Sequence, residues 1–248
     1  MSAWILLRGL TRESRHWGTL PQRVSDAFSE ARVLPVDLPG NGEFAALRSY
    51  RRVADMVGFV RVVAVERGIP APYRVLAMSL GGMVATDWAQ RYPDEIESLV
   101  LINTSMRPFN WPHERLRPQA WPMLMRIAAH WREPRVAESA VHALTCNNRV
   151  SLADDLDTWS AIRRSAPVSR INAWRQLMAA ASFRAESQPP RCRTLILSSA
   201  ADGLVNPLCS ARLAAAWRAP HRHHASAGHD LPHDDPAWLV EQMLDGLR

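Results

Sequence analysis

Two kinds of hydrophobic pattern alternate along the chain. Short apolar runs typical of buried strands are separated by longer segments in which apolar residues recur at helical spacing, as Val53, Val57, Val60 and Ala64 do. This alternation favours an α/β fold, a mainly parallel sheet with helices on both faces. The predicted strands cover residues 4–7, 32–36, 74–78, 99–103, 194–198 and 221–225. The predicted helices cover residues 49–67, 80–92, 207–217 and 236–247.

The middle of the chain, residues 106–190, breaks this alternation. It is long, has no clear strand pattern and holds five of the ten tryptophans. Aromatic and methionine side chains at helical spacing are more typical of internal packing than of ligand contacts. We therefore predict a helical insertion at 106–190 within one core made of residues 1–105 and 191–248. Its predicted helices cover residues 116–130, 135–144, 151–163 and 170–183.

Composition narrows the class of protein. The chain has 248 residues, with 47% apolar and 22% charged content, which is ordinary for one globular domain. It has no run of eighteen apolar residues, so no membrane span is expected. The first apolar run lacks a basic leader and is too short for a signal peptide, which makes a cytoplasmic location the expectation. The scattered Cys146, Cys192 and Cys209 argue against a disulfide framework and are interpreted as structural.

The charged residues exclude several kinds of chemistry. All 30 basic residues are arginine, so Schiff-base catalysis, a Ser–Lys dyad and a P-loop are excluded. The formal net charge is +6, but the arginines are scattered singly or in pairs rather than gathered in a basic tract. Nucleic acid is therefore not an expected partner. His221, His223 and His224 share one predicted strand, yet no carboxylate or cysteine completes a ligand set, so no metal site and no cofactor are predicted.

Ser79 is the main candidate for chemistry. It follows a strand-like run and precedes Leu80, Gly81 and Gly82 at the start of a predicted helix. A nucleophile on a tight strand-to-helix turn needs small neighbours, because the strand and the helix approach closely there. The pattern reads A-x-S-x-G, with Ala77 in a position where glycine is usual. The spacing indicates an exposed, strained serine.

Two further residues follow Ser79 in a suggestive order. Asp202 comes just after the predicted strand 194–198, and His229 lies in a loop near the end of the chain. Serine, acid and then histidine is the chain order of the α/β-hydrolase triad. The chain resembles that superfamily over essentially its whole length. The matching motifs are Asp37-Leu-Pro-Gly-Asn-Gly42, the turn at Ser79, D-x-x-V-x-P from Asp202, and Gly228-His229 followed by Asp235-Pro236.

The resemblance implies roles for several residues. Ser79, Asp202 and His229 would be catalytic, and the backbone N–H groups of Leu10 and Leu80 would form the oxyanion hole. The segment 106–190 would be a helical cap that supplies much of the substrate pocket, and the family's opening β-hairpin is expected to be absent. Where relatives have histidine in the loop after the first strand, this chain has Arg8. Arg8 would either brace that loop or help hold a carboxylate of the substrate.

The resemblance also implies an activity. The chain is similar to small bacterial carboxylesterases, pimeloyl-ester esterases among them. This similarity implies cleavage of a small-molecule ester or thioester through an acyl-enzyme intermediate. Menaquinone-synthesis α/β-hydrolases have a similar outline, and a lyase that uses the triad as a base on an acidic substrate is the alternative. A non-catalytic ligand-binding protein on the same scaffold is the third hypothesis. Nothing in the pattern favours one oligomeric state.

Overall fold

The computed structural model describes residues 3–247 and has an α/β fold. Six strands in this part of the chain form one sheet in the order β2-β1-β3-β4-β5-β6, and all neighbouring strands are parallel. The predicted parallel sheet is therefore confirmed. Pro35 is tolerated in β2 because this strand lies at an edge of the sheet. The strands are β1 (Trp4–Leu7), β2 (Val33–Val36), β3 (Tyr73–Met78), β4 (Ile96–Ile102), β5 (Arg193–Ser199) and β6 (His221–His224).

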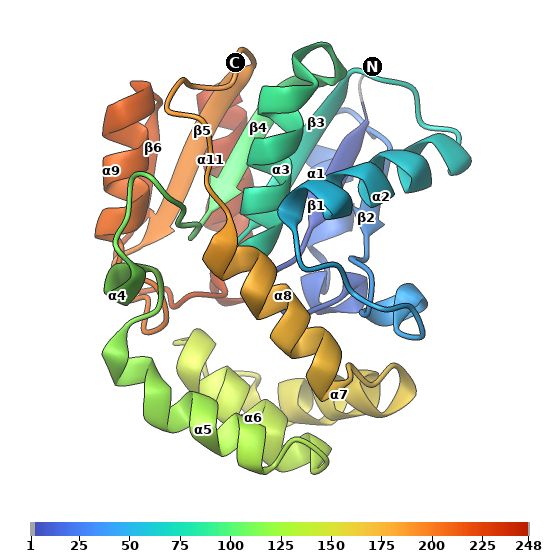
Figure 1. Cartoon of the computed structure of the whole chain (residues 1–248), viewed down its shortest axis with the longest axis vertical. Coiled ribbons are helices and arrows are strands. Elements are labelled where there is room, and N and C mark those ends of the chain that lie inside the picture. The colour runs from blue at the N-terminus through green and yellow to red at the C-terminus, as the bar shows by residue number, and fades with distance from the viewer. Residues whose placement is uncertain (1–2, 248) are drawn as a thin grey trace.

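Helices cover both faces of the sheet (Figure 1). Successive side chains of β1 point to opposite faces, so Ile5 and Leu7 belong to one buried cluster while Trp4 and Leu6 belong to the other. Burial on both faces explains why β1, β3 and β4 are almost continuously apolar. The first cluster includes side chains from α2 (Val53–Glu66), α3 (Leu80–Arg91) and α9 (Leu208–Trp217). The second includes side chains from α1 (Leu20–Ala27) and α11 (Pro236–Leu247).

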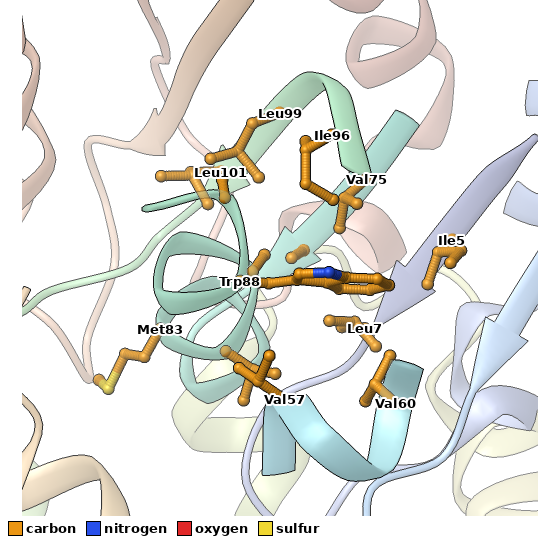
Figure 2. Close-up of a cluster of buried hydrophobic side chains, with 14 of the residues drawn as sticks. Ile5, Leu7, Val57, Val60, Val75, Met83, Trp88, Ile96, Leu99 and Leu101 are labelled. Carbon is orange, nitrogen blue, oxygen red and sulfur yellow. The ribbon is translucent and has the colours of Figure 1, made fainter. Parts of the chain in front are cut away.

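Trp88 anchors α3 against the sheet. Its indole is fully buried and lies between the strands and α2, close to Val57 and Val60 (Figure 2). The indole Nε1 donates to Glu95 at 2.7 Å, so its one polar atom is satisfied at the edge of the core. Burying a tryptophan on this scale stabilises the fold by several kcal/mol. The anchor fixes the helix that begins directly after Ser79.

The chain between β4 and β5 forms a separate group of helices (Figure 1). Helix α8 runs back along the core, where the buried Gln176 accepts from the Thr11 N–H at 2.8 Å and donates to Asn41 at 2.8 Å. The predicted helix 116–130 is interrupted, since a short 3-10 turn at Pro118–Ala120 precedes α5. The helices are α4 (Pro112–Arg115), α5 (Trp121–Ala129), α6 (Pro134–Thr145), α7 (Leu152–Ser165) and α8 (Arg170–Ser182).

The remaining elements are short. Helix α10 (Leu231–Asp234) follows His229, and 3-10 turns lie at Ser14–Trp17, Gly42–Phe44 and Pro93–Glu95. Helix α1 is not among the helices predicted from the sequence. Its buried residues are Leu20 and Val24, so its apolar pattern is weak. None of the helices in residues 3–247 is both long and apolar enough to cross a bilayer.

Candidate functional site

The sequence-predicted residues gather at one edge of the sheet. Ser79 follows β3, Asn103 follows β4, Asp202 follows β5 and His229 follows β6, while Arg8 follows β1. Parallel strands present their carboxyl ends at the same edge. The strand order also changes direction between β1 and β3, because β2 lies on the other side of β1. Such a switch point opens a crevice where α/β proteins bind ligands.

Ser79 occupies a strained turn. Its φ of 52° and ψ of −120° are unusual for a residue with a side chain. Gly81 makes the turn possible, since a Cβ at that position would lie 2.4 Å from the Leu7 carbonyl oxygen. Gly9 leaves similar room, because a Cβ there would lie 3.1 Å from the Ser79 Cβ. The loop after β1 therefore packs directly against the serine, which remains partly exposed.

Asp202 and His229 form a buried pair. The His229 Nδ1 lies 2.7 Å from the Asp202 Oδ2, and both side chains are at most 5% exposed. The other carboxylate oxygen, Oδ1, accepts from the N–H groups of Leu204 and Val205 at 2.8 and 2.9 Å. These bonds fix the carboxylate so that Oδ2 faces the imidazole. A carboxylate held against Nδ1 leaves Nε2 as the nitrogen that can accept a proton.

Asn103 and Thr104 connect the serine turn to the histidine loop. The Asn103 Nδ2 donates to the His229 carbonyl at 2.8 Å, and the Thr104 hydroxyl donates to the Ser79 carbonyl at 2.9 Å. Asn103 also accepts from the Ser199 N–H at 2.8 Å, which ties it to the end of β5. Consecutive residues therefore hold the backbone of the Ser79 turn and the backbone of the His229 loop. The structure thus places the three predicted triad residues beyond the carboxyl ends of the sheet strands, with Asp202 and His229 in direct contact.

The charges around His229 favour its protonated form. Burial lowers the pKa of the imidazole, but the Asp202 charge and hydrogen bond, with a smaller contribution from Asp230, outweigh burial. Arg8 acts in the opposite direction and lowers the pKa. The net result is a His229 pKa above its ordinary value of 6.5. The imidazolium is therefore stabilised where a proton would arrive from a serine.

Arg8 makes a buried ion pair with Asp230. Its two terminal nitrogens donate to the two carboxylate oxygens at 3.0 and 2.5 Å, and both side chains are less than 5% exposed. The guanidinium also lies 4.7 Å from the centre of the Trp17 ring. Burial raises the pKa of Asp230, but the charge and hydrogen bonds of Arg8 lower it by more than burial raises it. The net pKa of Asp230 is therefore below its ordinary value. The pair joins the loop after β1 to the residue next to His229.

The two residues predicted for the oxyanion hole flank the serine. Leu80 is the first residue of α3, so its N–H has no acceptor within the helix. Leu10 lies in the loop after β1, directly after Gly9, which packs on Ser79. The neighbouring Thr11 is held by Gln176 of α8. The structure therefore places both backbone segments beside Ser79.

Sequence reasoning missed three residues that position this site. Asn103 is a polar residue at the end of a predicted strand, and that position is the only signal that the sequence gives for its role. Asp230 and Gln176 gave no usable pattern, because their partners Arg8 and Thr11 lie more than 160 residues away in sequence. Such contacts depend on the three-dimensional arrangement of loops.

Comparisons with known proteins show which proteins the chain is similar to. A sequence model described as the alpha/beta hydrolase family matches residues 4–242. The pimeloyl-[acyl-carrier protein] methyl ester esterase of Chromobacterium violaceum is 39% identical over 107 residues, which cover 41% of this chain and 39% of that protein. Matches to other curated relatives likewise span less than half of the relatives' lengths.

Solved structures show the same fold over the whole chain. The enol-lactonase of Burkholderia xenovorans superimposes with a TM-score of 0.78 at 19% identity and covers 100% of this chain and 92% of its own. A thermophilic esterase of Thermogutta terrifontis gives a TM-score of 0.76 at 20% identity, covering 100% of this chain and 90% of its own. At this level of identity the likeness concerns the fold alone.

Proposed function

Since the chain belongs to the alpha/beta hydrolase family, we propose that it is a serine hydrolase that cleaves a carboxylic ester or thioester through an acyl-enzyme intermediate. The observation that carries the proposal is the strained turn at Ser79, which Asn103 and Thr104 tie to the loop of the buried His229–Asp202 pair. A hydroxyl at such a turn is presented to substrate, and an imidazole held by a carboxylate is a base poised to accept its proton.

In the proposed mechanism, the Ser79 Oγ attacks the substrate carbonyl while His229 takes its proton at Nε2. Asp202 holds the imidazole in the required tautomer and stabilises the imidazolium. His229 then gives the proton to the leaving alcohol or thiol, and the acyl group remains on Ser79. A water molecule, activated by the same histidine, attacks the acyl-enzyme and releases the acid.

The backbone N–H groups of Leu80 and Leu10 would stabilise the negative oxygen that forms during attack. Two preorganised donors in a site shielded from water act strongly, and the loss of one typically costs about 2.7–4 kcal/mol. The close packing of Gly9 on Ser79 supports this role, because it brings the Leu10 backbone to the serine. Ala77 in place of the usual glycine is fully buried in β3 and leaves the turn intact.

We propose that residues 106–190 act as a cap over this site and supply the pocket for a small-molecule ester. Helix α8 supports this assignment, because Gln176 binds the loop after β1. The relatives named as pimeloyl-[acyl-carrier protein] methyl ester esterases favour an ester substrate. The lyase alternative has less support, because the terminal nitrogens of Arg8 donate to Asp230 rather than lying unpaired.

Pre-steady-state hydrolysis of p-nitrophenyl esters tests the acyl-enzyme route. We expect a burst of p-nitrophenol that approaches one equivalent per chain and is followed by slower turnover. Comparing acetate, butyrate and octanoate esters would show which acyl length the cap accepts. Turnover of ester without covalent labelling by a serine-directed phosphonate would contradict the proposal. Absence of both turnover and labelling in a folded sample would favour the lyase or the binding protein.

The pH dependence of kcat/KM reports on His229. The free imidazole must be neutral to accept the Ser79 proton, so the rate falls as pH drops through the pKa of His229. Because this pKa is raised, we expect the midpoint of the acid limb above 6.5, with about a tenfold loss per pH unit below it. Tryptophan fluorescence over the same pH range would show that the chain stays folded. A midpoint well below 6.5 would mean that another group controls the limb.

A further inference from the structure

A second group of chemically reactive side chains lies between the helical insertion and α10. A ring nitrogen from each of His142 and His233 and the Cys146 sulfur all lie within 4.8 Å of one another. His142 and Cys146 are one helical turn apart at the end of α6, and the Cys146 N–H donates to the His142 carbonyl at 2.8 Å. His233 comes from α10, so the cluster brings together segments about ninety residues apart in sequence.

Asp155 of α7 lies beside the two histidines, although it is not one of the three residues whose ligand atoms all lie within 4.8 Å of one another. Its Oδ2 lies 3.2 Å from the His233 Nε2 and 3.5 Å from the His142 Nε2. In a tetrahedral zinc site, nitrogen, oxygen and sulfur ligands lie about 3.3–3.6 Å from one another, as the usual metal–ligand distances require. The Asp155 oxygen is therefore already close to ligand spacing from each imidazole nitrogen, whereas the nitrogens and the sulfur, within 4.8 Å of one another, would move slightly closer on binding an ion.

The His142 Nε2 lacks a close hydrogen-bond partner among the described residues, since the Asp155 Oδ2 lies 3.5 Å away. The side chain is only 1% exposed, and its Nε2 is a buried polar atom that makes no hydrogen bond within the described residues. A buried nitrogen of this kind loses the interaction with water and normally needs a replacement. The Asp155 carboxylate at 3.5 Å gives at most a long contact, so a cation bound between the two groups would complete the environment of the nitrogen.

The surroundings keep the donors in place and suit a positive ion. The Trp159 ring packs against the rings of His142 and His233, with centroids 5.4 and 5.1 Å away. Arg12 is a nearby cation that would oppose a metal, and it pairs at 2.6 Å with Glu138, a carboxylate that it shares with Arg163. Asp155 is the carboxylate that faces the two imidazoles, so the cluster has a negative charge to offer.

We propose that His142, Cys146 and His233, with Asp155 as a fourth ligand, form a binding site for one zinc-like transition-metal ion. Two imidazoles, a thiolate and a carboxylate suit Zn²⁺ or Co²⁺, whereas Ca²⁺ and Mg²⁺ prefer oxygen ligands. On binding, the Cys146 thiol loses its proton to solvent and the sulfur forms a bond to the metal, so one proton is released per ion.

An ion at this site would link the helical insertion to the loop that holds His229. The Asp230 N–H donates to the Thr145 carbonyl at 2.8 Å, so the end of α6 already touches that loop. Gly228 packs there as well, since a Cβ at this position would lie 2.5 Å from the Thr145 oxygen. The metal would clamp α6, α7 and α10 together and stabilise the folded chain by mass action.

Titration of the metal-free, reduced protein with Co²⁺ tests the site. We expect one equivalent to give the visible bands of tetrahedral cobalt and a near-ultraviolet band from thiolate charge transfer, both displaced by Zn²⁺. The dissociation constant for Zn²⁺ should be about 1 µM or tighter, and the melting temperature should rise with Zn²⁺ concentration. Absence of the cobalt bands would overturn the proposal.

Single substitutions assign the ligands. Cys146→Ser should remove the charge-transfer band, and Cys146→Ser and His233→Gln should each weaken Zn²⁺ binding by more than about a hundredfold, beyond the loss typical of an outer-shell change. Cys192→Ser and His223→Gln are matched controls outside the cluster and should bind as the native chain does. His233 is only partly buried, so its variant tests the site even where substitution of the buried Cys146 disturbs folding. Unchanged binding in His233→Gln would rule the site out.

Discussion

Ser79→Ala is expected to lower kcat for ester hydrolysis by about a millionfold, the loss typical of removing the nucleophile of a catalytic triad. The hydroxyl forms the acyl bond, so no other group in the turn replaces it. The fold should be unaffected, because Ser79 holds its place through backbone bonds, with its N–H donating to the Ile102 carbonyl at 3.0 Å. Steady-state rates and melting temperatures of the two proteins would check both statements.

The control for this substitution is Ser98→Ala. Ser98 lies near the start of β4, at the end of the strand that is opposite to the candidate site. Its buried hydroxyl has no hydrogen-bond partner within the described residues. Its removal should leave kcat unchanged. A Ser79→Ala protein that kept its rate within tenfold of native would show that Ser79 is not the nucleophile.

Covalent labelling can locate the nucleophile in the same experiment. Since the chain has no lysine, trypsin cleaves it only after arginine, and one expected peptide covers residues 75–91. Ser79 is the only serine in that peptide. A phosphonate adduct on this peptide in the native chain, absent from Ser79→Ala, would identify the residue. An adduct on another peptide would contradict the assignment.

The fold was predictable because the strands are buried on both faces. Runs such as β3 are almost wholly apolar, so their pattern stands out from the polar loops that follow. The order Ser79, Asp202, His229 was equally visible, because Ser79 and Asp202 each lie just beyond such a run and His229 follows them in a loop near the end of the chain. The edge strand β6 was harder to predict, since its four residues are basic and partly exposed. Only its position after α9 indicated a strand.

Pairings across the fold could not be predicted. Arg8 was expected to brace a loop or to hold substrate, but the choice of Asp230 as its partner depends on how two loops meet at the sheet edge. The cluster of His142, Cys146 and His233 escaped notice for the same reason: two of its members share a helix, while the third comes from α10. Periodicity describes which face of an element is buried, but not which element covers it.

The Arg8–Asp230 pair should have a large effect on stability. Asp230→Asn leaves the buried guanidinium without its counter-charge, so we expect the free energy of unfolding to fall by about 3–5 kcal/mol. Glu43→Gln is a suitable control, because the Arg67–Glu43 pair is exposed and such pairs contribute at most about 1 kcal/mol. Urea denaturation of both variants and the native chain would measure the difference. Equal, small losses in the two variants would mean that the buried pair is not important for stability.

A double substitution then separates the two roles predicted for Arg8. Arg8→Met with Asp230→Leu removes both charges and fills the space with apolar groups, so most of the lost stability should return. If Arg8 only braces the loop, this stable double variant hydrolyses neutral and acidic esters with the same preference as the native chain. If Arg8 also holds a substrate carboxylate, KM for a monoester of a dicarboxylic acid rises at least about tenfold while KM for a neutral ester of equal length does not, as expected when a charge-assisted bond is lost. Because both terminal nitrogens already donate to Asp230, we expect the first result.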